Sequence, residues 1–273
     1  MSKQGEYLAE LQLFILERNK RVPTLNNKQQ NRTFFTRMRL LIGILILISL
    51  NSFSQKEKPK NYRRFDEKTI HFGFMLGANT SNFTVIQNTN AYTDFGLKTV
   101  TAKSTPGGQV GIVSTLKLGT PVVRLRFVPT LSFQERVLVY QFDTLITGND
   151  IEFNEERVSS TNIDFPLMFQ FRTLRLNNFA TYVLMGAQYS IDLQSQEESS
   201  QDFNDPFLKI KKYDFQAQLG IGIEFFAPYF KFGMEVKYSH GLRSSFVPEN
   251  TFIAKPIDRL FNNVWWFSII FEG

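Results

Sequence analysis

The sequence predicts an all-β fold, an eight-stranded antiparallel up-and-down transmembrane β-barrel preceded by a signal peptide helix. Three observations predict it. From Ile70 onward, apolar and polar residues alternate with a period of two, as in a sheet with one apolar face. Long and short connections alternate along the chain, as they do in barrels of the outer membrane. Each run also exceeds the roughly 9–11 residues that a tilted membrane strand needs.

The composition fits a membrane barrel better than a helical bundle. The chain has 29 Phe among 273 residues, yet only 42% is hydrophobic and the mean hydropathy is −0.19. This balance is expected where only every second residue faces lipid. The absence of cysteine excludes disulfides and thiolate metal sites. With His71 and His240 as the only histidines, a site of several histidines is excluded as well.

The net charge of +6 does not indicate nucleic-acid binding. Residues 1–54 carry eight of the 31 basic residues and three of the 25 acidic ones, so the remainder is nearly neutral. The basic excess therefore lies in a leader and not in a phosphate-binding patch. No nucleic acid, small-molecule substrate or cofactor is expected.

Residues 38–54 have the pattern of a signal peptide: a positive start, an apolar run to Leu50 and a cut between Ser54 and Gln55. The apolar run is too short to span a bilayer, which needs about 20 residues. Residues 1–37 are either an upstream extension, with Met38 as the true start, or a cytoplasmic n-region. Residues 55–69 are expected as a periplasmic linker, and residues 70–273 as the barrel.

Eight strands can be placed, with tight or long connections between them in strict alternation. The tight ones are Gly119–Pro121, 174–178 and Ala227-Pro228. Outer-membrane barrels have short periplasmic turns and longer outer loops. The expected strands are 70–87, 105–118, 122–142, 157–173, 179–194, 207–226, 229–243 and 260–272.

The polar faces of these strands are expected to fill the lumen. Because eight strands enclose just enough space for side chains, charges of both signs there should pair with one another and leave no diffusion pore. Hydrogen-bonded glutamines are expected beside them: Gln170, Gln188, Gln216 and Gln218. Glycines on the same face would leave room for the longer side chains. The predicted lumen charge network comprises Arg124, Arg126, Asp164, Arg172, Asp192, Asp214, Glu224, Lys231, Glu235 and Lys237.

Three segments resemble one known family of barrels. Residues 71–79 (HFGFMLGAN) resemble the first strand of the PorT family, 189–196 (YSIDLQSQ) the end of its fifth strand, and 229–242 (YFKFGMEVKYSHGL) its seventh. The resemblance implies a Bacteroidetes outer-membrane protein that is required, with other secretion-system proteins as partners, for type IX protein secretion and the gliding motility that shares its machinery. It implies a structural or assembly role and no enzyme activity.

Two other interpretations stay open. A small barrel of this kind can act instead as an adhesin or envelope-stabilising protein through its outer loops. A barrel enzyme would need a catalytic His240, but Ser239 and His240 are adjacent on a strand and should face opposite sides. His71 is expected at a membrane interface. The acidic stretch from Gln196 to Asp205 is read as a solvated loop, with calcium binding as the alternative.

Overall fold

The computed structural model describes residues 60–62, 64–90, 93, 97–142, 153–197, 207–251 and 253–273. The predicted signal peptide, its cleavage site at Ser54 and Gln55, and the segment before Met38 lie outside the described residues. So does most of the acidic stretch that was considered for calcium.

The described part of the chain is one short helix, α3 (Arg64–Glu67), followed by nine β-strands. None of its helices is long and apolar enough to cross a membrane. The strands are β1 (Ile70–Gln87), β2 (Leu97–Lys117), β3 (Val123–Phe127), β4 (Thr130–Phe142), β5 (Phe153–Arg172), β6 (Phe179–Asp192), β7 (Tyr213–Phe226), β8 (Lys231–Gly241) and β9 (Ile257–Glu272).

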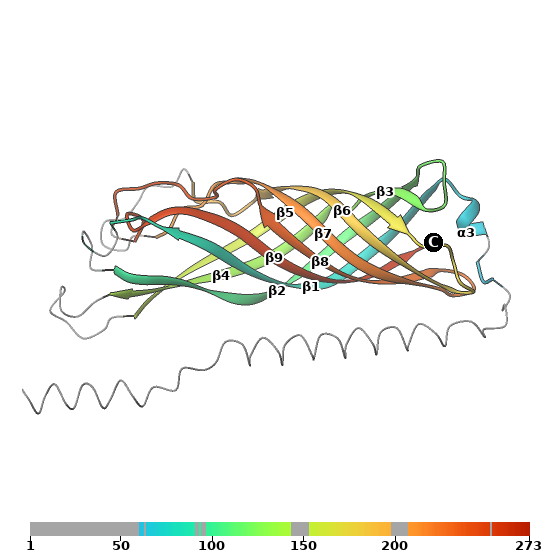
Figure 1. Cartoon of the computed structure of the whole chain (residues 1–273), viewed down its shortest axis with the longest axis horizontal. Coiled ribbons are helices and arrows are strands. Elements are labelled where there is room, and N and C mark those ends of the chain that lie inside the picture. Colours follow the sequence, from blue (N-terminus) through green and yellow to red (C-terminus); the bar gives the residue numbers. More distant parts are fainter. Residues whose placement is uncertain are drawn as a thin grey trace, which may run out of the picture. The chain divides into compact units, whose positions relative to one another are not determined.

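The strands form a closed antiparallel ring (Figure 1). From β5 to β9 each strand pairs with the next in sequence, and β1 closes the ring by pairing with both β9 and β2. β3 and β4 together fill one position between β2 and β5, because both pair with those two strands. The nine segments therefore make an eight-stranded up-and-down barrel, as predicted.

A proline divides the third of these positions. Pro129 has no amide hydrogen to donate, and the ladder is interrupted at Val128 and Pro129. The neighbouring strands still hold this point, since Ile112 N donates to Pro129 O at 3.0 Å and Val128 N donates to Pro166 O at 3.3 Å. The ring thus stays continuous across the interruption.

The predicted alternation of connections is confirmed. The strand ends joined by the short connections 118–122, 173–178 and 227–230 lie at one end, together with α3 and the C-terminus. The strand ends that flank the long connections 88–96, 143–152, 193–212 and 242–256 lie at the other (Figure 1). Short turns mark the periplasmic end of such barrels. We therefore call the end that carries α3 the periplasmic end, and the opposite end the outer end.

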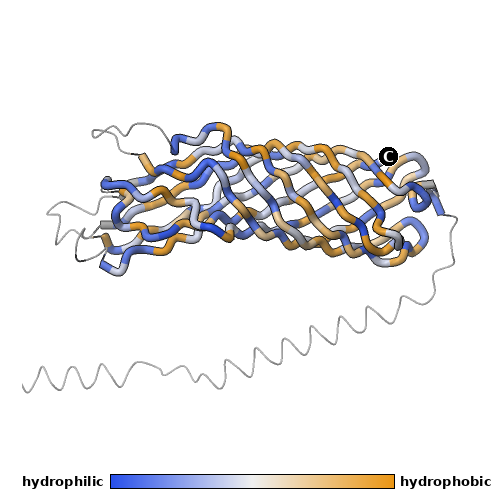
Figure 2. Tube along the Cα trace, turned by 90° about the horizontal axis from the view of Figure 1, so that it is seen from above, coloured by the Kyte–Doolittle hydropathy of each residue, from blue (hydrophilic) through white to orange (hydrophobic). Residues whose placement is uncertain are grey.

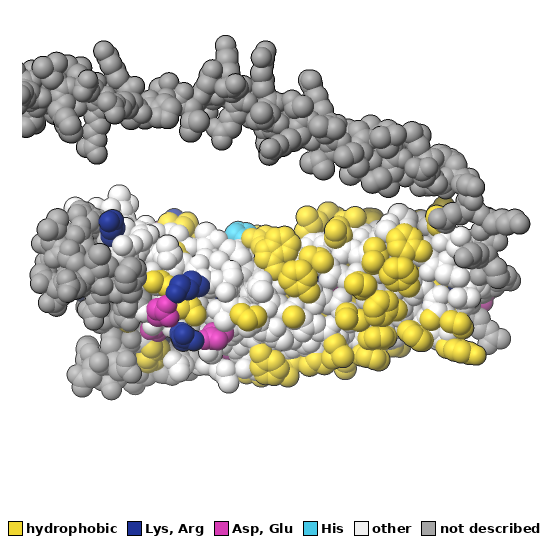
Figure 3. Space-filling view, turned by 90° about the horizontal axis from the view of Figure 1, so that it is seen from below, with side chains coloured by type: hydrophobic (Ala, Val, Ile, Leu, Met, Phe, Trp, Pro, Cys, Tyr) yellow, Lys and Arg dark blue, Asp and Glu magenta, His cyan; other side chains and the backbone are white. Residues whose placement is uncertain are grey.

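The outward side chains form an apolar belt around the barrel. Hydrophobic and polar residues alternate along the tube in Figure 2, and hydrophobic side chains cover much of the wall in Figure 3. Leu219 and Ile221 are 57% and 63% exposed, which would be unfavourable in water but is favourable in hydrocarbon. Aromatic rings pair near both edges of the belt, with Phe74 on Phe271 at 5.0 Å and Tyr238 on Trp265 at 4.9 Å between centroids.

Part of the barrel continues past the belt at the outer end. β2 and β5 have 21 and 20 residues, about twice what a membrane crossing needs. Their outer halves expose charged side chains, including the ion pair of Lys103 Nζ with Glu155 Oε1 at 2.6 Å. Figure 3 shows such charged groups gathered toward one end of the wall. This extension explains why β2 and β5 begin earlier than predicted.

Candidate functional site: a lumen closed at both ends

All ten side chains of the predicted lumen charge network are buried inside the ring. They divide into two groups that lie at different heights. Seven of them lie toward the periplasmic end and form, with Glu272, what we call the inner cluster; the other three are aspartates toward the outer end. The inner cluster consists of Arg124, Arg126, Arg172, Glu224, Lys231, Glu235, Lys237 and Glu272.

Arg126 is the centre of the inner cluster. Its guanidinium contacts Glu235, and its Nη2 lies 3.9 Å from Glu224 Oε1 and 3.8 Å from Glu272 Oε1. Lys231 pairs with Glu272 and, at 2.9 Å, with Glu224. All these groups are at least 97% buried. An isolated charge would be very costly at this buried site. Each cation of the cluster is therefore stabilised by the carboxylates beside it, and each carboxylate by the cations.

Glycines on the lumen face make room for the largest side chains, as expected. A Cβ on Gly222 would lie 2.3 Å from Tyr182 Cζ, and one on Gly220 would lie 2.6 Å from Lys237 Cγ. The ring of Tyr182 occupies the space beside Gly222 and its hydroxyl donates to Glu235 Oε2 at 2.8 Å. The position of this tyrosine, and its bond to the inner cluster, therefore require glycine on the neighbouring strand.

Gly222→Ala is expected to lower the free energy of unfolding by about 1–3 kcal/mol, the usual cost of overpacking a filled interior. Gly233→Ala is a matched control on the next strand, because the nearest atoms to its added Cβ lie 3.6 Å away, an ordinary contact. Urea unfolding in detergent micelles measures both. Equal stability of the two variants would show that Tyr182 is not held as described.

The three outer aspartates are held by hydrogen bonds rather than by ion pairs. Asp164 accepts hydrogen bonds from Ser132 and Ser190 at 2.6 Å, and Asp214 accepts from Gln216 at 2.8 Å. Asp192 accepts from a backbone amide at 2.9 Å. Within the described part of the chain, none of the three forms an ion pair. The expectation of mutual charge pairing is therefore wrong for this half of the lumen, but the expected hydrogen-bonded glutamines are present, since Gln188 donates to Asp164 and Gln216 to Asp214, both at 2.8 Å.

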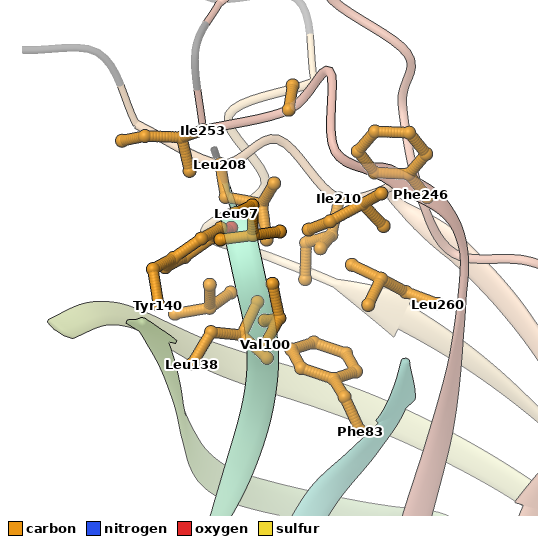
Figure 4. Close-up of a cluster of buried hydrophobic side chains, with 13 residues drawn as sticks. Phe83, Leu97, Val100, Leu138, Tyr140, Leu208, Ile210, Phe246, Ile253 and Leu260 are labelled. Atoms are coloured by element: carbon orange, nitrogen blue, oxygen red, sulfur yellow. The ribbon is translucent and has the colours of Figure 1, made fainter. Parts of the chain in front are cut away.

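Apolar side chains separate and cover these polar layers. Between the two groups lies a layer that includes Met75, Met168 and Leu184. At the outer end, side chains from β1, β2, β4, β5, β9 and two long connections converge into an apolar cap (Figure 4). The apolar cap consists of Phe83, Leu97, Val100, Leu138, Tyr140, Val158, Leu208, Ile210, Phe246, Ile253, Ala254, Ile257 and Leu260. From this packed core we expect no continuous aqueous path through the described lumen.

Residues 60–62 and 64–67 close the periplasmic end, where the sequence predicted a linker. We call this segment the inner plug. Phe65 is fully buried and stacks on His71, with ring centroids 3.8 Å apart. Asp66 Oδ1 lies 3.0 Å from Arg172 Nη1, and Asp66 Oδ2 lies 3.3 Å from Arg175 Nη1. His71 is thus an interior residue, and its expected place at the membrane interface is wrong.

Protonation of Asp66 at low pH should weaken the contacts of the inner plug. Burial alone would raise the pKa of Asp66, but hydrogen bonds and charges from Arg172 and Arg175 outweigh it and lower the pKa. Because the pKa is lower in the folded state, Asp66 stabilises the fold above the ordinary value of 3.8 and this contribution is lost as the pH falls through the lowered pKa.

Asp66→Asn is therefore expected to destabilise the protein at pH 7 and to differ little from the unsubstituted protein at pH 2. Unfolding titrations at the two pH values measure this. Glu67→Gln is the matched control, since it removes the same charge from the exposed neighbouring residue. An Asp66→Asn effect that persists unchanged at pH 2 would contradict the ion pairs.

The structure does not bring together the residues of a Ser-His site. Ser239 lies inside the barrel, where Trp266 Nε1 donates to its hydroxyl at 2.5 Å. His240 lies on the outer wall, with Nδ1 at 2.6 Å from Asn263 Oδ1. The prediction that these two adjacent residues face opposite sides is confirmed.

A closed antiparallel ring with an apolar outer belt and a polar interior defines an integral β-barrel of the outer membrane, embedded in its lipid bilayer. Residues 32–247 match the family described as the outer membrane protein beta-barrel domain. The match covers more than half of the chain, so the chain belongs to this family.

Solved structures with similarity to this chain include the outer membrane protein OprG and the attachment invasion locus protein Ail. OprG from Pseudomonas aeruginosa is 14% identical, with 74% of this chain and 92% of that chain covered and a TM-score of 0.40. Ail of Yersinia pestis, solved alone and with the heparin analogue sucrose octasulfate, is 10% identical, with coverage of 76% and 100% and a TM-score of 0.34. No curated protein matches the sequence.

Proposed function

We propose that this outer-membrane barrel is a structural or assembly component of type IX protein secretion, of the PorT type, and that it acts through its surfaces rather than by passing cargo. The observation that carries the proposal is the closed lumen, filled by the inner cluster, the apolar cap and the inner plug. A barrel that cannot conduct must act by contact. The proposal includes no catalytic step.

The three segments that resemble the PorT family contribute to this interior. Residues 71–79 contain His71, which stacks on Phe65 of the inner plug. Residues 229–242 supply Lys231, Glu235 and Lys237 of the inner cluster. The residues that suggested the family are therefore among those that fill and close the barrel, which supports a shared architecture and, by inference, a shared role.

A clean deletion in the host tests the proposal. Proteins with a C-terminal sorting domain should fail to reach the outside, and gliding should stop if the host glides. Complementation with the full-length gene should restore both. Normal export in the deletion strain would refute the proposal.

The strand extension favours a second candidate, an adhesin or envelope-stabilising protein. β2 and β5 extend charged faces beyond the membrane belt, where these faces can contact other surfaces. On this alternative, protease treatment of whole cells cuts the outer connections and abolishes attachment, while the deletion strain secretes normally. The same secretion assay thus separates the two candidates.

A further inference from the structure

The periplasmic end of the barrel is an electropositive pocket that one short segment fills. Six cations gather there, five from the strands and one from the connection 173–178, against three carboxylates of the inner cluster. Without the inner plug, this end of the barrel therefore has an excess of positive charge. Asp66 supplies a fourth carboxylate from the inner plug. The six cations are Arg124, Arg126, Arg172, Arg175, Lys231 and Lys237.

Arg124 is the least satisfied of these groups. Its side chain is completely buried, and none of its three nitrogens has a hydrogen-bond partner in the part of the chain that the structure describes. Its nearest carboxylate oxygen, Asp66 Oδ1, is 3.7 Å from Nη2. A buried guanidinium that lacks partners has capacity for a further acceptor.

An aromatic ring of the inner plug lies among these cations. Phe65 lies against His71, and the edge of Phe226 is 5.6 Å away between centroids. Lys231 Nζ lies 4.7 Å from the ring centroid of Phe65, and Arg124 Cζ lies 5.4 Å from it. Cations over an aromatic face favour an aromatic over an aliphatic residue at this position. The pocket is therefore suited to an aromatic residue that is followed directly by an acidic one.

We propose that this pocket is a peptide-docking site for a periplasmic protein that presents an aromatic–acidic pair, and that the chain's own Phe65-Asp66 occupies it until such a partner competes. Charge complementarity selects the partner, since the wall carries unpaired positive charge. The inner plug is short, and its helix has only four residues. Its release would expose Arg172 and Arg175 to the periplasm. The inference does not depend on a role in secretion.

Peptide exchange on the full-length barrel in detergent tests the proposal. The probe is a fluorescent peptide with the sequence of residues 61–68. The barrel variant Phe65→Ala/Asp66→Asn leaves the pocket vacant and should bind the probe in an anisotropy titration. The unsubstituted barrel should bind it at least tenfold more weakly, because its tethered segment competes at an effective concentration on the order of millimolar.

Two peptide variants make the test specific. The Asp66→Asn peptide should bind the vacant barrel about tenfold more weakly or worse, as expected from loss of a charge-assisted contact. The Glu67→Gln peptide loses the same charge at an exposed position and should bind like the probe. Circular dichroism is first used to check that each barrel variant has folded into β-sheet.

Three results would overturn the proposal. One is a folded vacant barrel that does not bind the probe. Another is equal binding of the Asp66→Asn and Glu67→Gln peptides, which would mean that the pocket has no preference for the acidic position. The last is an unsubstituted barrel that takes up no probe even at millimolar concentration, which would make the inner plug a permanent part of the wall.

Discussion

Replacing Arg126 with methionine is expected to lower the free energy of unfolding by about 3–5 kcal/mol, the largest effect that we expect from a single lumen substitution. Arg126 lies within 4.0 Å of Glu224, Glu235 and Glu272, and all four groups are buried. Methionine fills a similar volume but leaves the carboxylates with fewer cations. Equilibrium unfolding in detergent micelles, followed by the fluorescence of the buried Trp266, measures the loss.

Two controls separate this effect from a general loss of charge. Lys103→Met removes an exposed ion pair with Glu155 and should change stability little. The double variant Arg126→Met/Glu235→Gln should recover part of the loss, because one unpaired carboxylate is removed with its cation. A single Arg126→Met variant as stable as the unsubstituted protein would mean that the inner cluster is hydrated rather than buried.

Leu219→Arg is expected to destabilise the barrel in lipid bilayers by about 2–4 kcal/mol, the cost of a cation on the lipid face near the membrane midplane. Leu219 faces outward, 57% exposed, halfway along β7 between Tyr213 and Phe225. Reversible folding into lipid vesicles measures the change.

Leu174→Arg is the matched control, because it makes the same substitution in a short periplasmic turn. Leu174 is 74% exposed but lies outside the strands, where a charge costs about 0–1 kcal/mol at most. If both variants folded equally well, the apolar belt around Leu219 would not face lipid.

The sequence was sufficient to predict the ring and most of the charged residues in its membrane-level lumen. Alternation along β7 and β8 placed Glu224 and Glu235 on the inner face, and the alternating connection lengths fixed the even number of strands. These signals are strong because a slip of one residue would turn every lipid-facing side chain into the lumen.

The parts that the sequence did not predict lie where that alternation is weak. Arg136 lines the lumen beyond the membrane, directly before residues 137–140 of β4, which are apolar on both faces, so its orientation could not be read from a pattern. Glu272 ends a strand whose inner face is partly apolar as well. The outer half of β2 lacks an apolar outer face because it stands in water.

The inner plug was missed for a different reason. Asp66 and Phe65 belong to a polar stretch with no period, and their role depends on Arg172 and Arg175, which are more than 100 residues away in sequence. A single sequence does not show such long-range contacts. A signal was present, however, since Phe65 is an apolar aromatic residue within a polar, mostly charged segment.

Electrical recording from the purified protein in planar lipid bilayers tests the central claim, a barrel that spans the membrane with a filled lumen. A filled lumen predicts that the protein inserts into the bilayer without steady ion conductance. It also predicts that current stays absent when Asp66→Asn loosens the inner plug alone, because the inner cluster and the apolar cap still fill the barrel. Regular open-channel steps from the unsubstituted protein would contradict it.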